Sequence, residues 1–430
     1  MGEKAFDMNE LYIGRIFVSK KAALHKVYAW VLAIYIAFAS LSSKGHLLLF
    51  GALGVLTLIW LFFEDITIKK CRYISCYALF GCMAVLSMFN SQSKSNSLTF
   101  LAGYVAFFGV CILMSNISIE FVGYFMKCLF IVMGIFAVLT FIQAFSPEIV
   151  DKICALLLDD SALEQNRNFV SAGDVYGGLP GITAQTGINA FYMAIFAGMC
   201  LIRVLSKREY RAVYVIGLML GVFDLIKTNK RGMLIFFCMM AFILILLHYR
   251  KHFAKAVILC VVIGCIGLAV LLFTDVGRRI LQKFISAGLS GRETLWKNAL
   301  IEFAEHPILG MGIDSYATKY GMDAHNIYLQ VLCETGIVGF IAFMAFVVFN
   351  FVSALKCCCI EYENNSMKMI AYFIVFMQGI FLLWGLSGNT LYDQMTLCSY
   401  MIAVGACNAF KLAIKENKHE SRNLDVCQNK

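Results

Sequence analysis

Apolar residues along the chain gather into twelve runs that are separated by short polar or charged connections. A helix needs about 20 apolar residues to cross about 30 Å of hydrocarbon. The runs lie near 26–43, 46–63, 71–90, 97–115, 121–145, 183–205, 209–226, 232–249, 254–273, 326–354, 368–388 and 391–411. This pattern predicts an all-α, polytopic transmembrane helical bundle of about 12 spans.

The connections divide the predicted bundle into parts. Only two of them have real length, 146–182 and 274–325. We therefore predict an N-terminal transmembrane bundle over 1–273 with about nine spans and an extracytoplasmic loop over 274–325. C-terminal spans over 326–411 and a cytoplasmic tail over 412–430 follow.

Composition agrees with a membrane protein. The chain is 60% hydrophobic and only 15% charged, whereas soluble domains carry about 25% charged residues. The net charge of +9 could indicate nucleic acid, but an excess of Lys and Arg in cytoplasmic loops explains it more simply. We expect membrane lipids and no nucleic acid as partners.

The 17 cysteines show no metal-ligand or disulfide spacing and indicate small buried side chains.

Loop charges predict the orientation. One set of connections carries the cations Lys20, Lys21, Lys26, Lys69, Lys70, Arg72, Arg203, Lys207, Arg208, Arg211, Arg250, Lys251, Lys255, Lys411, Lys415 and Lys418. The positive-inside rule places this set and both termini in the cytoplasm. No cleavable signal peptide is evident. The prediction is a multi-pass protein of the cell membrane whose two long loops face the periplasm or exterior.

Several cations contradict this orientation bias. Lys230 and Arg231 lie in a predicted outward turn, and Arg292 lies in the second long loop. Outward cations indicate an anionic partner. The alternatives are contact with lipid headgroups and ordinary solvated charge.

The second long loop contains an amphipathic helix over 291–306. Ser290 and Glu293 form the pattern of a capping box, so a helix should begin here. Leu295, Trp296, Ala299 and Phe303 fall on one face. We expect the helix to lie on the membrane surface. An anion beside Arg292 would gain both free backbone N–H groups and the guanidinium.

Three other helix starts repeat this arrangement. Asn229 is the predicted cap of the helix that begins with Arg231. Asp323 is the predicted cap of the helix that carries His325 and Asn326, and Thr183 that of the helix that carries Gln185. Convergent N-termini and arginines would suit a pyrophosphate. His325 fits a base or hydrogen-bond role, and a capping or packing histidine is the alternative. No Walker loop, HExxH motif or nucleophile elbow is present.

The order and spacing of these residues resemble a known family. The pattern is Gly291-Arg292, Trp296, Ala299, Pro307-x-x-Gly310-x-Gly312, His325-Asn326-x-Tyr328-Leu329 and Glu334-x-Gly336-x-x-Gly339. It resembles the signature of the O-antigen ligase and polymerase family over 291–340. Lys230-Arg231-Gly232 is similar to that family's Ser-Arg-Gly element, with Lys in place of Ser, and 181–190 resembles its preceding span.

The resemblance implies a glycosyltransferase of the GT-C type that needs no metal or other cofactor and inverts the anomeric centre. Its donor would be a glycan on undecaprenyl pyrophosphate, and its acceptor a hydroxyl of a lipid-linked or envelope-anchored molecule. Arg231 and Arg292 would bind the pyrophosphate, and His325 would serve the acceptor. Substrate-binding residues would be Lys230, Gln185, Trp296, Asn326 and Tyr328.

Alternatives remain open. A polymerase and a ligase share the motif; we favour the polymerase slightly because nothing indicates a special acceptor. A flippase or transporter of lipid-linked sugars would share the span count, but flippases more often carry charges at membrane depth. A purely structural membrane protein would not need arginines at outward helix starts.

Overall fold

The computed structural model describes residues 8–38, 41, 43–63, 72–172, 177–206, 209–274, 277–278, 291–360 and 365–428. Every regular element in these ranges is a helix. The elements are α1 (Met8–Phe38), α2 (Ser43–Phe63), α3 (Arg72–Ser87), η1 (Met88–Asn90), α4 (Lys94–Ser115), α5 (Ile119–Phe145), α6 (Pro147–Leu157), α7 (Asp160–Ser171), α9 (Thr186–Ser206), α10 (Arg211–Lys227), α11 (Arg231–His248), η2 (Arg250–His252), α12 (Phe253–Phe273), α14 (Arg292–Glu305), α15 (Tyr316–Tyr320), α16 (Ile327–Cys358), α17 (Asn365–Trp384) and α18 (Gln394–Gln428). The predicted all-α class is confirmed.

Each of the twelve predicted runs contains a helix. Seven of these helices, α4, α5, α9, α11, α16, α17 and the Gln394–Lys415 part of α18, are long and apolar enough to cross a membrane. Shorter apolar helices occupy Ala23–Phe38, Gly45–Trp60 and Ile74–Asn90. A membrane-embedded helical protein is therefore supported, while the number twelve and the GT-C type stay predictions.

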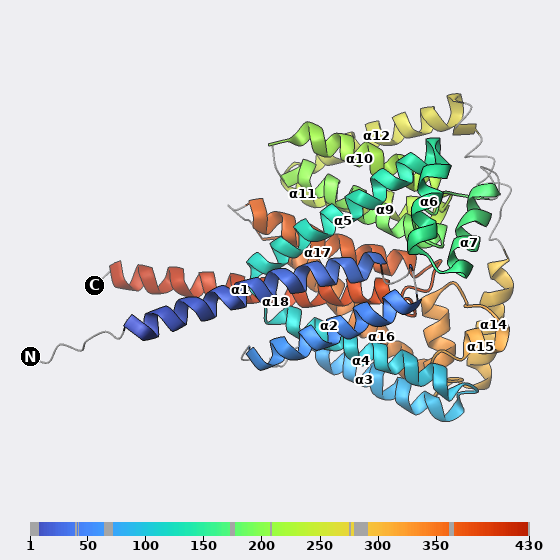
Figure 1. Cartoon of the computed structure of the whole chain (residues 1–430), viewed down its shortest axis with the longest axis horizontal. Helices are drawn as coiled ribbons and strands as arrows, with labels where there is room; N and C mark the ends of the chain where they lie inside the picture. The colour runs from blue at the N-terminus through green and yellow to red at the C-terminus, as the bar shows by residue number, and fades with distance from the viewer. Residues whose placement is uncertain are drawn as a thin grey trace, which may run out of the picture.

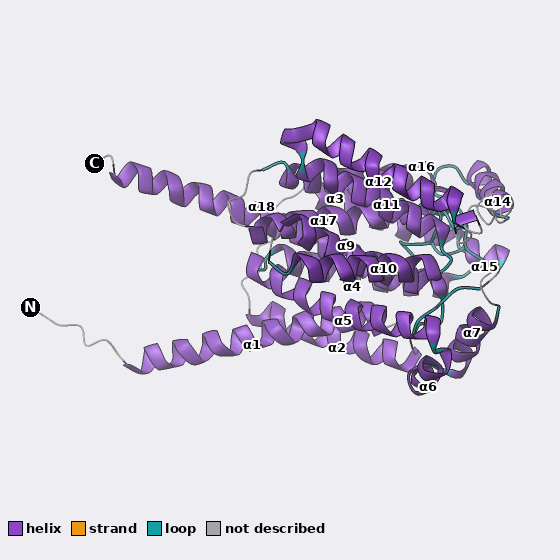
Figure 2. Cartoon of the chain, turned by 90° about the horizontal axis from the view of Figure 1, so that it is seen from above, coloured by secondary structure: helices purple, strands orange, loops and turns teal. Residues whose placement is uncertain are grey.

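The long helices run side by side and form a bundle with two different ends (Figure 1). The start of α1 and the end of α18 project from one end. At the other end, which we call the loop end, lie the short helices α6, α7, α14 and α15, and the view from above shows the same division (Figure 2). Both described chain ends thus lie opposite the loop end, as an even number of spans requires.

The centre of the bundle is formed by α9, α17 and α18. Between 72% and 78% of the apolar window of each is buried, compared with 28% for α11 at the periphery. Tyr192 of α9 is fully buried, and its hydroxyl donates to the carbonyl oxygen of Ile36 at 2.6 Å. A helix apolar on all sides can lie inside a bundle in this way because no polar face seeks water.

Helix α16 is broken at Gly336, which has φ 66° and ψ −175°. The segment 307–312 docks into this break. The amides of Met311 and Gly312 donate to the carbonyls of Cys333 and Glu334, at 2.9 and 3.1 Å, and the Ile337 amide donates to the Pro307 carbonyl at 2.9 Å. Backbone groups freed inside an apolar helix must find such partners, so the break and the loop form one unit.

Candidate functional site

Four connecting segments meet the helix ends that carry the predicted site residues. They are 177–185 before α9, 227–230 between α10 and α11, 306–326 between α14 and α16, and 385–393 between α17 and α18. Hydrogen bonds and close backbone approaches join them at the loop end. The site is described segment by segment below.

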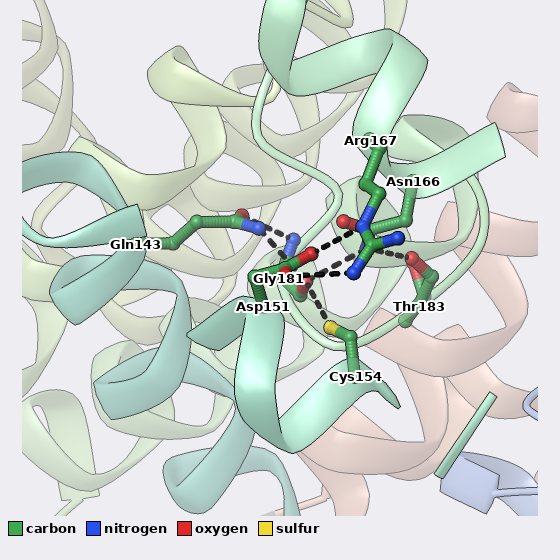
Figure 3. Close-up of polar contacts among 7 residues, drawn as sticks. All are labelled: Gln143, Asp151, Cys154, Asn166, Arg167, Gly181 and Thr183. Carbon is green, nitrogen blue, oxygen red and sulfur yellow. Dashed lines mark hydrogen bonds and ion pairs between the residues drawn. The ribbon is translucent and has the colours of Figure 1, made fainter. Parts of the chain in front are cut away.

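The segment before α9 is fixed by a buried polar cluster centred on Gly181 (Figure 3). The Gly181 carbonyl accepts from the side-chain amides of Gln143 and Asn166, at 3.1 and 3.0 Å, and the Gly181 amide donates to Gln143 Oε1 at 2.8 Å. Gly181 has φ 60°, and a Cβ there would lie 2.6 Å from Thr140 Oγ1. Three helices, α5, α6 and α7, thereby hold the approach to Gln185, with an exposed Arg167–Asp151 pair at 2.7 Å closing the outside.

The same segment binds the turn that precedes α11. The Leu179 amide donates to the Lys227 carbonyl at 2.9 Å, and the Asn229 side-chain amide donates to the Gly177 carbonyl at 2.7 Å. A Cβ built on Gly187 would lie 3.8 Å from Lys230 Cε. The first turn of α9 therefore lies against the Lys230 side chain.

The segment after α17 completes this side. The Ile327 amide at the start of α16 donates to the Gly385 carbonyl at 2.9 Å. A Cβ on Gly232 would lie 3.1 Å from Ser387 Oγ. The N-terminal ends of α11 and α16 thus both adjoin 385–387.

Three predicted helix caps are wrong, and the reason is backbone conformation. An N-cap residue needs extended φ/ψ directly before the first helical residue. Asn229 has φ 59°, so the cap position of α11 passes to Lys230 without a side-chain hydrogen bond. Asp323 lies too far from Ile327, and Asn326 caps α16 instead, accepting from the amides of Tyr328 and Leu329 at 3.0 and 3.2 Å.

The third cap, Thr183, instead donates its hydroxyl to the carbonyl of Pro180 or Gln185, at 2.7 or 2.8 Å. Helix α14 begins at Arg292, and its cap position is Gly291, which has φ 78° and no side-chain cap. Ser290 of the predicted capping box lies outside the described residues. The helix itself is confirmed at Arg292–Glu305. Its predicted apolar face has Ala299 buried and Leu295, Trp296 and Phe303 half-buried, and it packs against α16.

Arg292, Lys230 and His325 share one electrostatic environment. Partial desolvation by the surrounding protein lowers the pKa of His325, and the positive charges of Arg292 and Lys230 lower it further. The negative charge of Asp323 raises it. Partial desolvation and the positive charge of Arg292 also lower the pKa of Lys230. Lys230 and His325 nevertheless remain accessible to solvent. Three residues far apart in sequence therefore act on one another electrostatically, and two of them are exposed.

The other predicted residues divide into two groups. Arg231 follows Lys230 as the first, half-exposed residue of α11, and Gln185 is exposed directly before α9. Asn326 and Tyr328 have structural contacts: Asn326 is the cap of α16, and the Tyr328 hydroxyl donates to the Leu382 carbonyl at 2.7 Å. The indole N–H of Trp296 is buried and makes no hydrogen bond within the described part of the chain.

Sequence reasoning gave no role to two buried polar residues of α16: Gln330 was not named, and Glu334 was named only as part of the motif. Both are 0% exposed, and both bind the segment 314–324. Their signal was present, because a Gln and a Glu one helical turn apart inside an apolar run are costly unless they are paired.

One group in the described ranges has metal-ligand geometry: ligand atoms of Glu302, Glu305 and His306 lie within 4.8 Å of one another. Glu302 Oε1 already accepts from Lys319 Nζ at 2.6 Å and from the Tyr320 hydroxyl. That carboxylate is satisfied as an ion pair, so we assign the group no metal.

Together these features describe a multi-pass helical membrane protein whose Lys230, Arg292 and His325 interact electrostatically at one end of its bundle. Residues 216–344 match the family model described as O-antigen ligase. The match agrees with the resemblance noted in the motifs. The matched stretch runs from α10 into α16 and includes Lys230, Arg292 and His325.

A relative is found in Haemophilus influenzae. It is an uncharacterized protein that is 24% identical over 256 residues. The match covers 50% of this chain and 63% of that relative.

Proposed function

We propose that the protein is a membrane glycosyltransferase of the polysaccharide polymerase or O-antigen ligase type. It would move a glycan from undecaprenyl pyrophosphate to an acceptor hydroxyl on the outer face of the cytoplasmic membrane. The observation that carries this proposal is the shared environment of Lys230, Arg292 and His325 beside the starts of α11 and α16. The match to the O-antigen ligase family model supports the same reaction class.

The cations suit the leaving group. When the anomeric carbon–oxygen bond breaks, its electron pair goes to the pyrophosphate, whose growing charge must be stabilised. Arg292 supplies a planar donor fork that matches phosphate oxygens, and Lys230 and Arg231 add positive charge at a helix N-terminus. The helix N-terminus itself adds fixed partial positive charge.

His325 suits the acceptor. A neutral imidazole nitrogen takes the proton of the acceptor hydroxyl while the hydroxyl oxygen bonds to the anomeric carbon, and then passes it to water. Its lowered pKa keeps the ring neutral at neutral pH, as a base requires. The donor supplies its own activated bond, so the reaction draws on no nucleotide.

The orientation follows from the donor. A glycan polymer assembled on a lipid carrier is joined outside the cytoplasm, and the predicted cytoplasmic termini place the loop end there. We therefore propose that the site faces the periplasm or exterior.

The test is transfer by the purified protein in nanodiscs, supplied with an undecaprenyl-pyrophosphate-linked repeat from the producing strain. A polymerase would give a product ladder on the lipid, whereas a ligase would need a different acceptor. Arg292→Lys keeps the charge but loses the fork, and the rate should fall about 100-fold. Arg250→Lys is the matched control, because Arg250 lies outside this site and binds the Cys358 carbonyl. Full activity in Arg231→Ala, Arg292→Ala and His325→Ala would exclude these roles.

A second candidate, movement of the lipid-linked glycan across the membrane, rests on Asp224. This residue of α10 is 0% exposed, and neither carboxylate oxygen has a hydrogen-bond partner in the described ranges. Ionisable residues inside spans occur often in transporters. Translocation of a fluorescent lipid-linked sugar by proteoliposomes, lost in Asp224→Asn, would favour this candidate.

A further inference from the structure

Glu334 is a junction between three parts of the loop end. It lies in α16 directly before the break and is 0% exposed. Oε2 accepts from the Asp314 amide at 2.7 Å and from the Tyr392 hydroxyl at 2.5 Å. Oε1 accepts from the Tyr316 amide at 2.9 Å and from Gln330 Nε2 at 3.2 Å. One carboxylate thus holds the loop before α15, the segment before α18 and the preceding turn of its own helix.

A carboxylate is needed because all four partners are donors. An ionised carboxyl group accepts at both oxygens, about four sites in total, whereas an amide presents N–H groups on one side. Glu334→Gln would therefore direct an N–H group at two of the four donors. Buried donors left without a partner are costly, so the geometry is specific to Glu.

Gln330 extends the junction toward His325. Its Oε1 accepts from the Ala324 amide at 3.0 Å, and its Nε2 reaches Asp323 Oδ1 at 3.3 Å as well as Glu334. His325 follows directly in the left-handed region, with φ 51°. A non-glycine residue holds this conformation only where its surroundings determine it. Gln330 fixes the two residues that precede His325.

Tyr316 extends the junction toward Arg292. Its amide is held by Glu334, and its hydroxyl donates to the Leu295 carbonyl of α14 at 2.7 Å. Leu295 is in the first turn of the helix that begins with Arg292. One buried carboxylate is therefore connected to both the His325 segment and the Arg292 helix.

We propose that Glu334 and Gln330 are positioning residues that set the imidazole of His325 relative to the guanidinium of Arg292. Neither residue touches substrate in this scheme. Because the relay acts through Arg292 and His325, it rests on the function proposed above. A loss of position of about 1 Å in an active site can cost roughly 100-fold in rate.

The first test is Gln330→Met, which keeps the length of the side chain and removes its hydrogen bonds. The matched control is Gln378→Met. Gln378 of α17 is also 0% exposed, and its side-chain amide donates to the Ala403 carbonyl, away from the loop end. In nanodiscs with the lipid-linked repeat, Gln330→Met should lower kcat about 10- to 100-fold with little change in KM for the donor. Gln378→Met should transfer at the rate of the unmodified protein.

The pH profile separates positioning from general damage. The charged groups that act on His325 are Arg292, Lys230 and Asp323, and Asp323 raises its pKa. Without Gln330, Asp323 is released toward water and raises that pKa less. The acid limb of kcat/KM should therefore move to lower pH in Gln330→Met and stay in place in the control.

A double exchange provides a second measurement. Gln330→Glu puts a carboxylate against Glu334 and Asp323 and should be nearly inactive. Adding Glu334→Gln restores a donor–acceptor pair between the two positions and should recover part of the rate, since residues in one network do not add independently.

The outcomes are distinguishable. If His325→Ala is inactive while Gln330→Met keeps its rate and pH limb, the relay is wrong and the proposed function stands. If His325→Ala and Arg292→Ala both keep full activity, the proposed function itself is wrong.

Discussion

Gly336→Ala should displace the segment 307–312 from the break in α16 into which it docks. Gly336 has backbone angles that essentially only glycine adopts, and a non-glycine residue there costs about 1–3 kcal/mol. The new Cβ would lie 2.1 Å from the Ile308 carbonyl oxygen, so the loop must move by about 1 Å to restore ordinary contact. That movement breaks the three backbone hydrogen bonds of Met311, Gly312 and Ile337, each with a net value of about 0.5–1.5 kcal/mol. The total loss is about 3–7 kcal/mol.

A thermal melt in detergent should show this loss as a decrease of about 3–8 °C in the apparent Tm, because a larger chain shifts less per kcal/mol than a small domain. Maleimide labelling followed by mass spectrometry gives a local readout. Cys333 beside the break is 0% exposed and should label faster, while the equally buried Cys154 of α6 should not change. The control is Gly54→Ala in α2, where a Cβ meets no atom within 4 Å, and its Tm should stay the same or rise slightly. Unchanged Tm and unchanged Cys333 labelling in Gly336→Ala would refute the docking described for 307–312.

Three further predictions use single substitutions. Asn326→Ala should lose about 1 kcal/mol of stability, and Asn326→Asp almost none, because both Asn and Asp cap a helix. If Asn326→Asp abolishes transfer while its Tm stays normal, Asn326 binds substrate. Burial and the nearby Asp323 raise the pKa of Asp314 from 3.8 to about 6. A carboxyl group that binds its proton more tightly in the folded state stabilises the fold at low pH. The Tm should therefore fall as pH rises from about 4 to about 6, and Asp314→Asn should make that fall smaller. An equal fall of Tm in Asp314→Asn would contradict the raised pKa. Asp224→Asn should keep glycan transfer intact, because neither carboxylate oxygen has a hydrogen-bond partner in the described ranges. Loss of transfer at normal Tm would assign Asp224 to the reaction.

Hydrophobic patterning was sufficient to predict the helices. All twelve runs contain one, and the amphipathic helix in the second long loop lies within a residue of its expected bounds. Burial of apolar surface is a property of each segment by itself, so a single sequence reports it well. The number of helices that cross the membrane is less accessible, because α10 has only 17 residues and several others are short.

The helix starts were predicted less well, for a local reason. A capping residue is recognised by its side chain, but its role depends on φ and ψ. Asn229 and His325 both have positive φ directly before or near a helix start, which moves the cap to the next residue. Sequence pattern does not encode which of two adjacent polar residues makes that turn, so the right helices received the wrong caps.

The buried polar residues of α16 indicate how the second long loop folds, which the sequence of the loop alone does not. Gln330 and Glu334 are incompatible with hydrocarbon unless four backbone and hydroxyl donors come to them, and those donors lie in 314–324 and at Tyr392. Satisfying them forces the long loop to fold back against α16 and stops it from extending away from the bundle. The same constraint explains why the break at Gly336 is tolerated, since its freed carbonyls receive the amides of 311–312. The apolar helices thus determine where the loop end is, and the buried polar pair determines how Arg292 and His325 are held there.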